Sequence, residues 1–268
     1  MRIAEIDAQG RRPVGALLRE WRTRRRLSQL DLALDADISP RHLSFLETGR
    51  SRPSREMVLR LAERLEVPLR ERNELLVAAG FAPSFPERTL DDAALAAARR
   101  AMELVLQGHE PYPALAVDRH WTLVAANAAV PPLLAGVRSE LLAPPVNVLR
   151  LSLHPDGLAP RIANLREWRD HLLERLRRQV ELTADARLAA LLEELRGYPA
   201  GEEPPRGRAD YGGVAVPFRL RTPRGELAFL STTTVFGTPI DVTLAELAIE
   251  AFFPADERTA QALRQAPA

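Results

Sequence analysis

The chain has 268 residues, a length that predicts about two domains. It has no cysteine, which excludes disulfides and thiolate-bound metals, and no apolar run long enough to suggest a membrane span. The first residues lack the apolar core of a signal peptide, so we expect a cytoplasmic protein. The formal net charge is only +1, but residues 11–60 hold 12 arginines against 6 carboxylates, whereas residues 83–268 hold 21 against 24. The first part of the chain is therefore expected to meet an anionic partner.

The stretch from residue 28 to residue 47 predicts two short helices joined by a tight turn. Ser28 is a good N-cap for a helix over 29–36, and Ser39 caps a second helix that has Pro40 in its first turn. Asp37 falls in the turn, and aspartate tolerates the left-handed backbone better than most residues do.

The second of these helices has the features of a DNA recognition helix. Leu43 and Leu46 are three residues apart and point into a core, so the outer face near the helix start carries polar, basic and aromatic groups. These outer residues are Arg41, His42, Ser44 and Phe45. A recognition helix presents such residues to base edges.

The flanking segments complete a small helical domain. A basic helix is predicted from Arg11 to Arg26, and the basic loop 49–54 follows the recognition helix. Two more amphipathic helices begin after Ser54 and at Pro68, and Gly80 ends the last one. Five short helices within about 70 residues match the size of a DNA-binding domain.

This region resembles the Xre-type helix-turn-helix family, which has the all-α lambda-repressor-like fold. The pattern that carries the resemblance is Leu27-Ser28-Gln29, Leu32-Ala33, Ile38-Ser39, Leu46-Glu47, Gly49 and Pro53-Ser54. It departs from the family at Asp37, where glycine is usual. The resemblance implies that Arg22 pairs with Glu47 and that Gln29 contacts a phosphate.

We therefore expect double-stranded DNA as a partner. Arg41, His42, Ser44 and Phe45 would face base edges, with Arg41 the first choice for reading guanine. The residues expected to contact phosphates are Gln29, Arg50, Arg52 and Arg55. A single small domain reads one half-site, so a homodimer is expected, formed through the C-terminal domain or the helix Leu90–Gln107.

Residues 81–108 are interpreted as a linker and a connecting helix. Two prolines within Phe81–Arg88 predict an extended connector, after which Thr89 caps a helix from Leu90 to Gln107. This helix either transmits a signal between domains or packs as an ordinary part of the fold.

The remaining chain predicts an α+β domain. The expected elements are strands at 114–117 and 121–125, helices at 160–178 and 184–195, a loop at 197–208, a hairpin of strands 214–221 and 227–236, a strand or short helix at 242–252 and a tail helix at 255–265. This order favours an antiparallel sheet with helices on one face.

Residues 109–256 resemble the PAS-like ligand-binding domain of MmyB-type transcription regulators. The residues that carry the resemblance are His109-Glu-Pro-Tyr-Pro, Ala125-Ala-Asn127, Pro145-Val-Asn-Val-Leu-Arg150, His154-Pro-Asp-Gly157, Asn164-Leu, Glu167-Trp168, Phe236-Gly-Thr-Pro and Phe252-Phe-Pro-Ala-Asp256. The resemblance implies an Xre-type domain at 11–80, the PAS-like domain at 109–256, a tail at 257–268 and a role in transcription regulation.

A pocket in the second domain is expected to be apolar with few polar groups, which suits a small apolar ligand, with a fatty acid as the leading hypothesis. Its carboxylate would meet an arginine such as Arg150 or Arg219. The candidate lining residues are Asn127, Leu149, Trp168, Leu172, Phe218, Phe229 and Phe236. The alternative is that these are ordinary core residues.

No pattern in the sequence indicates catalysis. The five histidines lack metal-ligand spacing, and there is no glycine-rich phosphate loop, so we expect no enzyme activity, no metal and no cofactor beyond the apolar ligand. The alternative function is a DNA-binding adaptor or antitoxin-like protein whose second domain binds a protein partner. An apolar pocket would favour the sensor, and a flat exposed apolar patch would favour the adaptor.

Overall fold

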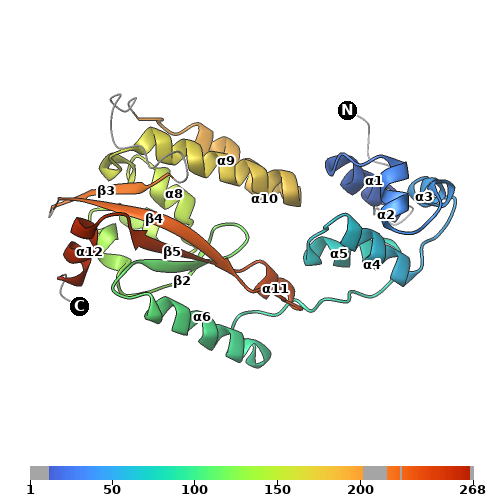
Figure 1. The fold of residues 1–268 in the computed structure, drawn as a ribbon, viewed down its shortest axis with the longest axis horizontal. Coiled ribbons are helices and arrows are strands. Elements are labelled where there is room, and N and C mark those ends of the chain that lie inside the picture. The colour runs from blue at the N-terminus through green and yellow to red at the C-terminus, as the bar shows by residue number, and fades with distance from the viewer. Residues whose placement is uncertain (1–11, 202–215, 224, 266–268) are drawn as a thin grey trace. The chain divides into compact units, whose positions relative to one another are not determined.

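The computed structural model describes residues 12–201, 216–223 and 225–265, and the rest of the chain lies outside the described residues. The chain divides into two compact units, the first consisting mainly of residues up to Glu87 and the second mainly of residues from Arg88 (Figure 1). Each unit is described separately below. No helix in the described ranges is long and apolar enough to cross a bilayer.

Within residues 12–87 the first unit consists of five α-helices. They are α1 (Val14–Arg24), α2 (Gln29–Asp35), α3 (Pro40–Glu47), α4 (Arg55–Arg64) and α5 (Leu69–Ala78). Ser28, Ser39 and Ser54 each accept a hydrogen bond from the backbone N–H three residues later, so all three predicted N-caps are present. Arg11, the predicted start of the first helix, lies outside the described residues, and the helix begins at Val14, after Pro13 at its N-cap position.

The turn between α2 and α3 has the predicted left-handed residue. Asp37 has φ of +53°, and the N–H of Ile38 returns to the carbonyl of Ala33 at 2.9 Å. Asp37 therefore occupies a left-handed position that glycine would adopt with less strain, and aspartate tolerates this backbone conformation.

The core of the first unit is formed by leucines from all five helices. Leu18, Leu32, Leu43, Leu61 and Leu76 are fully buried within it. α1 and α3 also approach through their backbones. A Cβ atom added at Gly15 would lie 2.3 Å from the carbonyl oxygen of Leu46, so only glycine fits this crossing.

The second unit contains a five-stranded antiparallel sheet in the order β2-β1-β5-β4-β3. The strands are β1 (Ala114–Val117), β2 (Leu123–Ala126), β3 (Phe218–Thr222), β4 (Gly225–Val235) and β5 (Ala248–Pro254). The predicted α+β class with an antiparallel PAS-like sheet is confirmed. The start of the predicted 214–221 strand lies outside the described residues, as does the end of the predicted 197–208 loop.

Helices cover both faces of this sheet, so the expectation of helices on one face was wrong (Figure 1). α6 (Ala96–Gly108) packs on one face through Met102 and Leu106, against Ala114 and Ala116 of β1. Leu115 and Val117 point to the other face. β1 is therefore apolar on both sides, and each side is covered by helices.

The second face is covered by α8 (Val148–Leu153), α9 (Leu165–Thr183) and α10 (Ala186–Arg196). The shorter elements are η1 (Ala93–Leu95), η2 (Pro131–Leu134), α7 (Ser139–Leu142), η3 (Ala159–Arg161), α11 (Val242–Ala245) and the C-terminal α12 (Glu257–Arg264).

Two predicted helix starts were too early. The connecting helix begins at residue 96 rather than 90, because Asp92, not Thr89, caps the turn that leads into it. The long helix begins at residue 165 rather than 160, because Pro160 belongs to the separate turn η3.

Candidate nucleic-acid interface and ligand pocket

α3 has one buried face and one outer face. Leu43 and Leu46 are buried in the core. Arg41 is exposed, while His42, Ser44 and Phe45 are partly exposed. The four residues predicted to face base edges therefore all lie off the buried face, as the spacing indicated.

Two arginines lie over the ring of Phe45. The guanidinium carbon of Arg41 is 5.3 Å from the ring centroid, and that of Arg50, in the loop after α3, is 5.9 Å away. Both distances are within the range of cation–π attraction. The aromatic ring thus gathers two of the predicted DNA-contacting cations at the same place on the surface.

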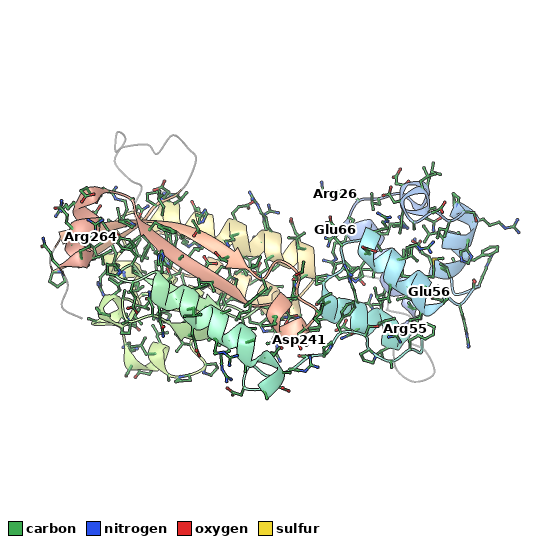
Figure 2. The ribbon with its side chains drawn as sticks, turned by 60° about the horizontal axis from the view of Figure 1, so that its bottom comes forward. Arg26, Arg55, Glu56, Glu66, Asp241 and Arg264 are labelled. Atoms are coloured by element: carbon green, nitrogen blue, oxygen red, sulfur yellow. The ribbon has the colours of Figure 1, made fainter. Side chains whose placement is uncertain are left out.

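The residues predicted to contact phosphates differ in their surroundings. Arg50 and Arg52 are exposed in the basic loop. The side-chain amide of Gln29 donates to Glu47 Oε2 at 2.7 Å. Arg55, in the first turn of α4 (Figure 2), donates to the carbonyl of Ala82 and the hydroxyl of Ser84. Gln29 and Arg55 therefore already have partners within the chain.

The ion pair that the resemblance implies between Arg22 and Glu47 is present. Arg22 Nε is 2.6 Å from Glu47 Oε1, and its Nη2 is 3.0 Å from Oε2. Glu47 is only 7% exposed. The hydrogen bond between Arg22 and this carboxylate raises the pKa of the Arg22 guanidinium. With the bond from Gln29, one carboxylate ties α1, α2 and α3 together.

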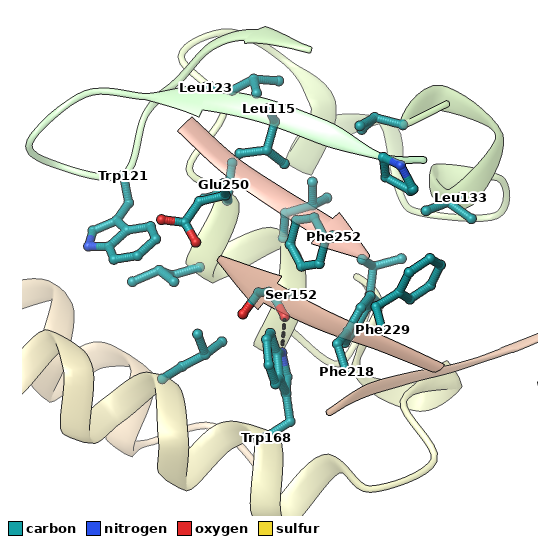
Figure 3. Close-up of a pocket in the computed structure, with 18 of the residues that line it drawn as sticks. Leu115, Trp121, Leu123, Leu133, Ser152, Trp168, Phe218, Phe229, Glu250 and Phe252 are labelled. Atoms are coloured by element: carbon teal, nitrogen blue, oxygen red, sulfur yellow. Dashed lines mark hydrogen bonds between the residues drawn. The ribbon is translucent and has the colours of Figure 1, made fainter. Parts of the chain in front are cut away.

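The second unit contains an apolar pocket between the sheet and the helices α8 and α9 (Figure 3). The cavity has a volume of about 100 Å³ for the centres of water molecules, which is several times the volume that one water needs. Five of the predicted lining residues line it: Leu149, Trp168, Leu172, Phe218 and Phe229. Further apolar walls come from Leu115, Leu133, Leu134 and Phe252.

Polar groups interrupt the pocket wall at a few points. The indole N–H of Trp168 donates to Ser152 Oγ at 3.0 Å, as the dashed line in Figure 3 marks. Glu250 lies beside Trp121 and away from Phe218 and Phe229 (Figure 3). It is bound by Arg175, whose Nη1 and Nη2 lie 2.9 and 2.6 Å from the two carboxylate oxygens. The sequence reasoning missed this pair of lining residues.

Further contacts fix the Arg175–Glu250 pair. Arg175 Nη2 also donates to Thr233 Oγ1 at 2.7 Å, and its guanidinium carbon lies 4.6 Å from the ring centroid of Trp121. Nearby, burial and then Arg175 lower the pKa of His171, which keeps that ring neutral at pH 7. The pair therefore carries no net charge and has no charged histidine beside it.

Two predicted lining residues lie elsewhere, which corrects the sequence-based expectation. Asn127 is buried in a hydrogen-bond network, where its amide donates to the carbonyls of Leu106 and Tyr112 and its oxygen accepts from Ala114 N–H. Phe236 packs into the cluster under α6, on the opposite face of the sheet.

The arginines expected to meet a ligand carboxylate are also elsewhere. Arg150 makes two hydrogen bonds of 2.7 Å to Glu194, and Arg219 is paired with Glu226. Neither lines the pocket. Surface carboxylates compensate both cations. Among the described residues, no group of three or more histidine, aspartate or glutamate side chains could hold a metal ion.

Comparison with known families matches both parts of the chain. Residues 18–72 match a helix-turn-helix family, and residues 98–266 match the MmyB-like transcription regulator ligand binding domain. The second match alone spans more than half of the chain. The two matches fall on the unit that contains α3 and on the unit that contains the pocket.

A curated relative is the "Putative HTH-type transcriptional regulatory protein" of Methanoculleus marisnigri, 36% identical over 116 residues, or 41% of this chain. The match covers 37% of that relative's length. Among solved structures, an RNA-binding Light-Oxygen-Voltage receptor matches with 15% identity over 92% of this chain and 61% of that one. Its TM-score is 0.27, too low to carry an argument.

Proposed function

The chain belongs to the MmyB-like transcription regulators, and we propose that it reads a specific DNA sequence with α3 and senses a small, mainly apolar ligand with its second unit. The observation that carries the proposal is the pairing, in one chain, of an Arg- and Phe-bearing outer face on α3 with an apolar pocket. A pocket favours a sensor over an adaptor, which would need only an outer docking surface.

DNA reading is assigned to the residues around Phe45. Arg41 would reach a guanine in the major groove, and Phe45 offers an apolar contact to a thymine methyl group. Arg50 and Arg52, which are exposed in the loop, would anchor phosphates. Gln29 and Arg55 would contact phosphates through the N–H donors that are not used by their partners within the chain.

The experiment for DNA reading is selection of bound sequences from a random pool by the full-length protein at near-physiological salt. An enriched two-fold symmetric motif is expected. Arg41→Ala should relax the preference at one position, at a cost of about 1–3 kcal/mol. Arg52→Ala, the matched control, should weaken binding to all sequences and reduce the salt slope by about one. Identical behaviour of the two variants across a panel of sites would refute these roles.

The ligand is proposed to be a small apolar molecule with an aliphatic chain like that of a fatty acid. Its chain would lie along the leucine and phenylalanine side chains, where the hydrophobic effect favours apolar groups. Extraction of the purified protein followed by mass spectrometry tests this. A Leu172→Trp variant, which fills the pocket, should carry much less ligand than the wild-type protein. An empty wild-type protein that also binds no added apolar molecule would refute the proposal.

A homodimer is proposed to form through α6. Its outer face carries a stripe of small and apolar side chains at helical spacing: Ala97, Ala101, Leu104 and Val105. Leu104 is 69% exposed and Val105 is 46% exposed, which is costly for a helix that stays in water. A second copy packed on this stripe would place two recognition helices in one assembly, as two half-sites require.

A further inference from the structure

The polar end of the pocket is an ion pair between a buried carboxylate and a partly exposed guanidinium, rather than a free cation. Glu250 is 4% exposed, and Arg175 approaches it with two nitrogens at 2.6 and 2.9 Å. Both residues line the pocket. An incoming ligand therefore meets a cation whose charge is already compensated by the carboxylate beside it.

The position of Glu250 follows from the register of the sheet. It lies on β5 opposite Thr233 of β4 and Leu115 of β1. The backbone of β5 is held between two strands, so the sheet fixes the position from which this side chain extends into the pocket wall. The hydroxyl of Thr233 donates to Glu250 Oε1 at 3.1 Å and fixes its orientation.

This arrangement is unfavourable for a charged head group. A ligand carboxylate at Arg175 would also lie next to the Glu250 carboxylate, and the two like charges would repel each other. A ligand cation at Glu250 would meet Arg175 in the same way. Either charge would lose its hydration without gaining a free counter-charge.

A neutral polar group meets better conditions. Within the described part of the chain, Oε2 of Glu250 accepts one hydrogen bond, from Arg175 Nη1, and a carboxylate oxygen can accept more than one. Ser152 accepts from the indole of Trp168, so its own O–H can donate to a ligand oxygen. A hydroxyl group can both donate and accept, and it therefore matches this wall.

We propose that the pocket selects an uncharged amphiphile, an aliphatic chain with an alcohol-type head group, and rejects the corresponding carboxylate. The inference rests on the proposed apolar-ligand function and names the head group that this function leaves open. Glu250 is the specificity-determining residue, because it compensates Arg175, the only cation among the described residues that line the pocket.

The test compares two ligands of equal chain length, 1-decanol and decanoate, by calorimetric titration of the full-length protein at pH 7.5. At this pH decanoate is ionised. The wild-type protein should bind 1-decanol at least tenfold more tightly. Equal or tighter binding of decanoate would overturn the inference while leaving an apolar-ligand sensor intact. Binding of neither ligand, together with an empty protein on extraction, would overturn the proposed function as well.

A variant test locates the selectivity. Glu250→Gln keeps the shape of the side chain and removes its charge, so Arg175 becomes available and the preference should shift at least tenfold toward decanoate. Glu226→Gln is the control, because Glu226 pairs with Arg219 outside the pocket and its loss should not move the preference. An unchanged preference in a folded Glu250→Gln protein would overturn the role of Glu250. If this variant does not fold, the wild-type comparison alone decides.

Discussion

Replacing Glu47 by alanine should unfold the DNA-binding unit more readily than any other single charge removal in it. The carboxylate accepts two hydrogen bonds from Arg22 and one from Gln29, and it is 7% exposed. Removing one partner of a buried pair costs about 3–5 kcal/mol, because the other charge remains buried. The Arg22 side chain keeps 12% exposure, so the lower end, about 3 kcal/mol, is expected.

Scanning calorimetry of the full-length protein measures this loss. For a domain of this size, about 3 kcal/mol corresponds to a fall in the melting temperature of roughly 12–24 °C. Glu20→Ala is the control. Its pairs with Arg12 and Arg24 are on the surface, so it should cost less than about 1 kcal/mol.

A double variant separates the buried charge from the lost contact. Arg22→Met combined with Glu47→Leu removes both charges and keeps apolar volume, so it should recover most of the stability that Glu47→Ala loses. A Glu47→Ala cost below about 1 kcal/mol would refute the reasoning. So would a double variant as unstable as the single one.

Three further outcomes are expected. Gly15→Ala should lower the unfolding free energy of the first unit by about 1–3 kcal/mol in urea titrations, because the new Cβ would lie 2.3 Å from the Leu46 carbonyl oxygen. An unchanged unfolding free energy would mean that α1 can move away from α3 at little cost. Burial raises the pKa of Asp185, but the hydrogen bonds from Arg119, His120 and the backbone N–H of Arg187, together with the charge of Arg119, outweigh burial and hold the pKa well below its usual range. Because the pKa is lower in the folded state, the ionised Asp185 stabilises the second unit. This stabilisation is fully present above the unfolded-state pKa of about 3.9 and is lost as the pH falls through the folded-state pKa. Acid titration of stability should show this loss in the wild type, and Asp185→Asn should flatten that part of the curve. Leu104→Glu should convert a dimer into a monomer in light scattering without changing the melting temperature of the second unit; an unchanged mass would exclude the α6 interface.

The first unit was predictable because its signals are local. Ser28 and Ser39 mark helix starts within three residues of the groups that they cap, and Asp37 occupies a turn whose length leaves few alternatives. The Arg22–Glu47 pair is not local, and only the family resemblance supplied it.

The pocket was predicted in part, because apolar spacing identifies buried residues without saying which cavity they face. Asn127 and Phe236 were expected in the pocket, but Asn127 is buried in contact with Leu106 of α6, and Phe236 is partly buried in the cluster under that helix. Arg175 and Glu250 are 75 positions apart, and the register of β5 brings them together. A glutamate inside the apolar run 247–253 was the available signal, since a buried charge in a strand needs a partner.

The alternation of side chains along β5 has a mechanical consequence. Ile249 and Ala251 pack under α6, while Glu250 and Phe252 face the pocket, so neighbouring residues of one backbone serve the two faces. Successive side chains of a strand point to opposite faces of the sheet, so both sets depend on one backbone. A guest that shifts the β5 backbone at Glu250 would therefore also shift Ile249 and Ala251, against which α6 packs. Ligand binding in the pocket can thus alter the packing of α6 through the β5 backbone alone.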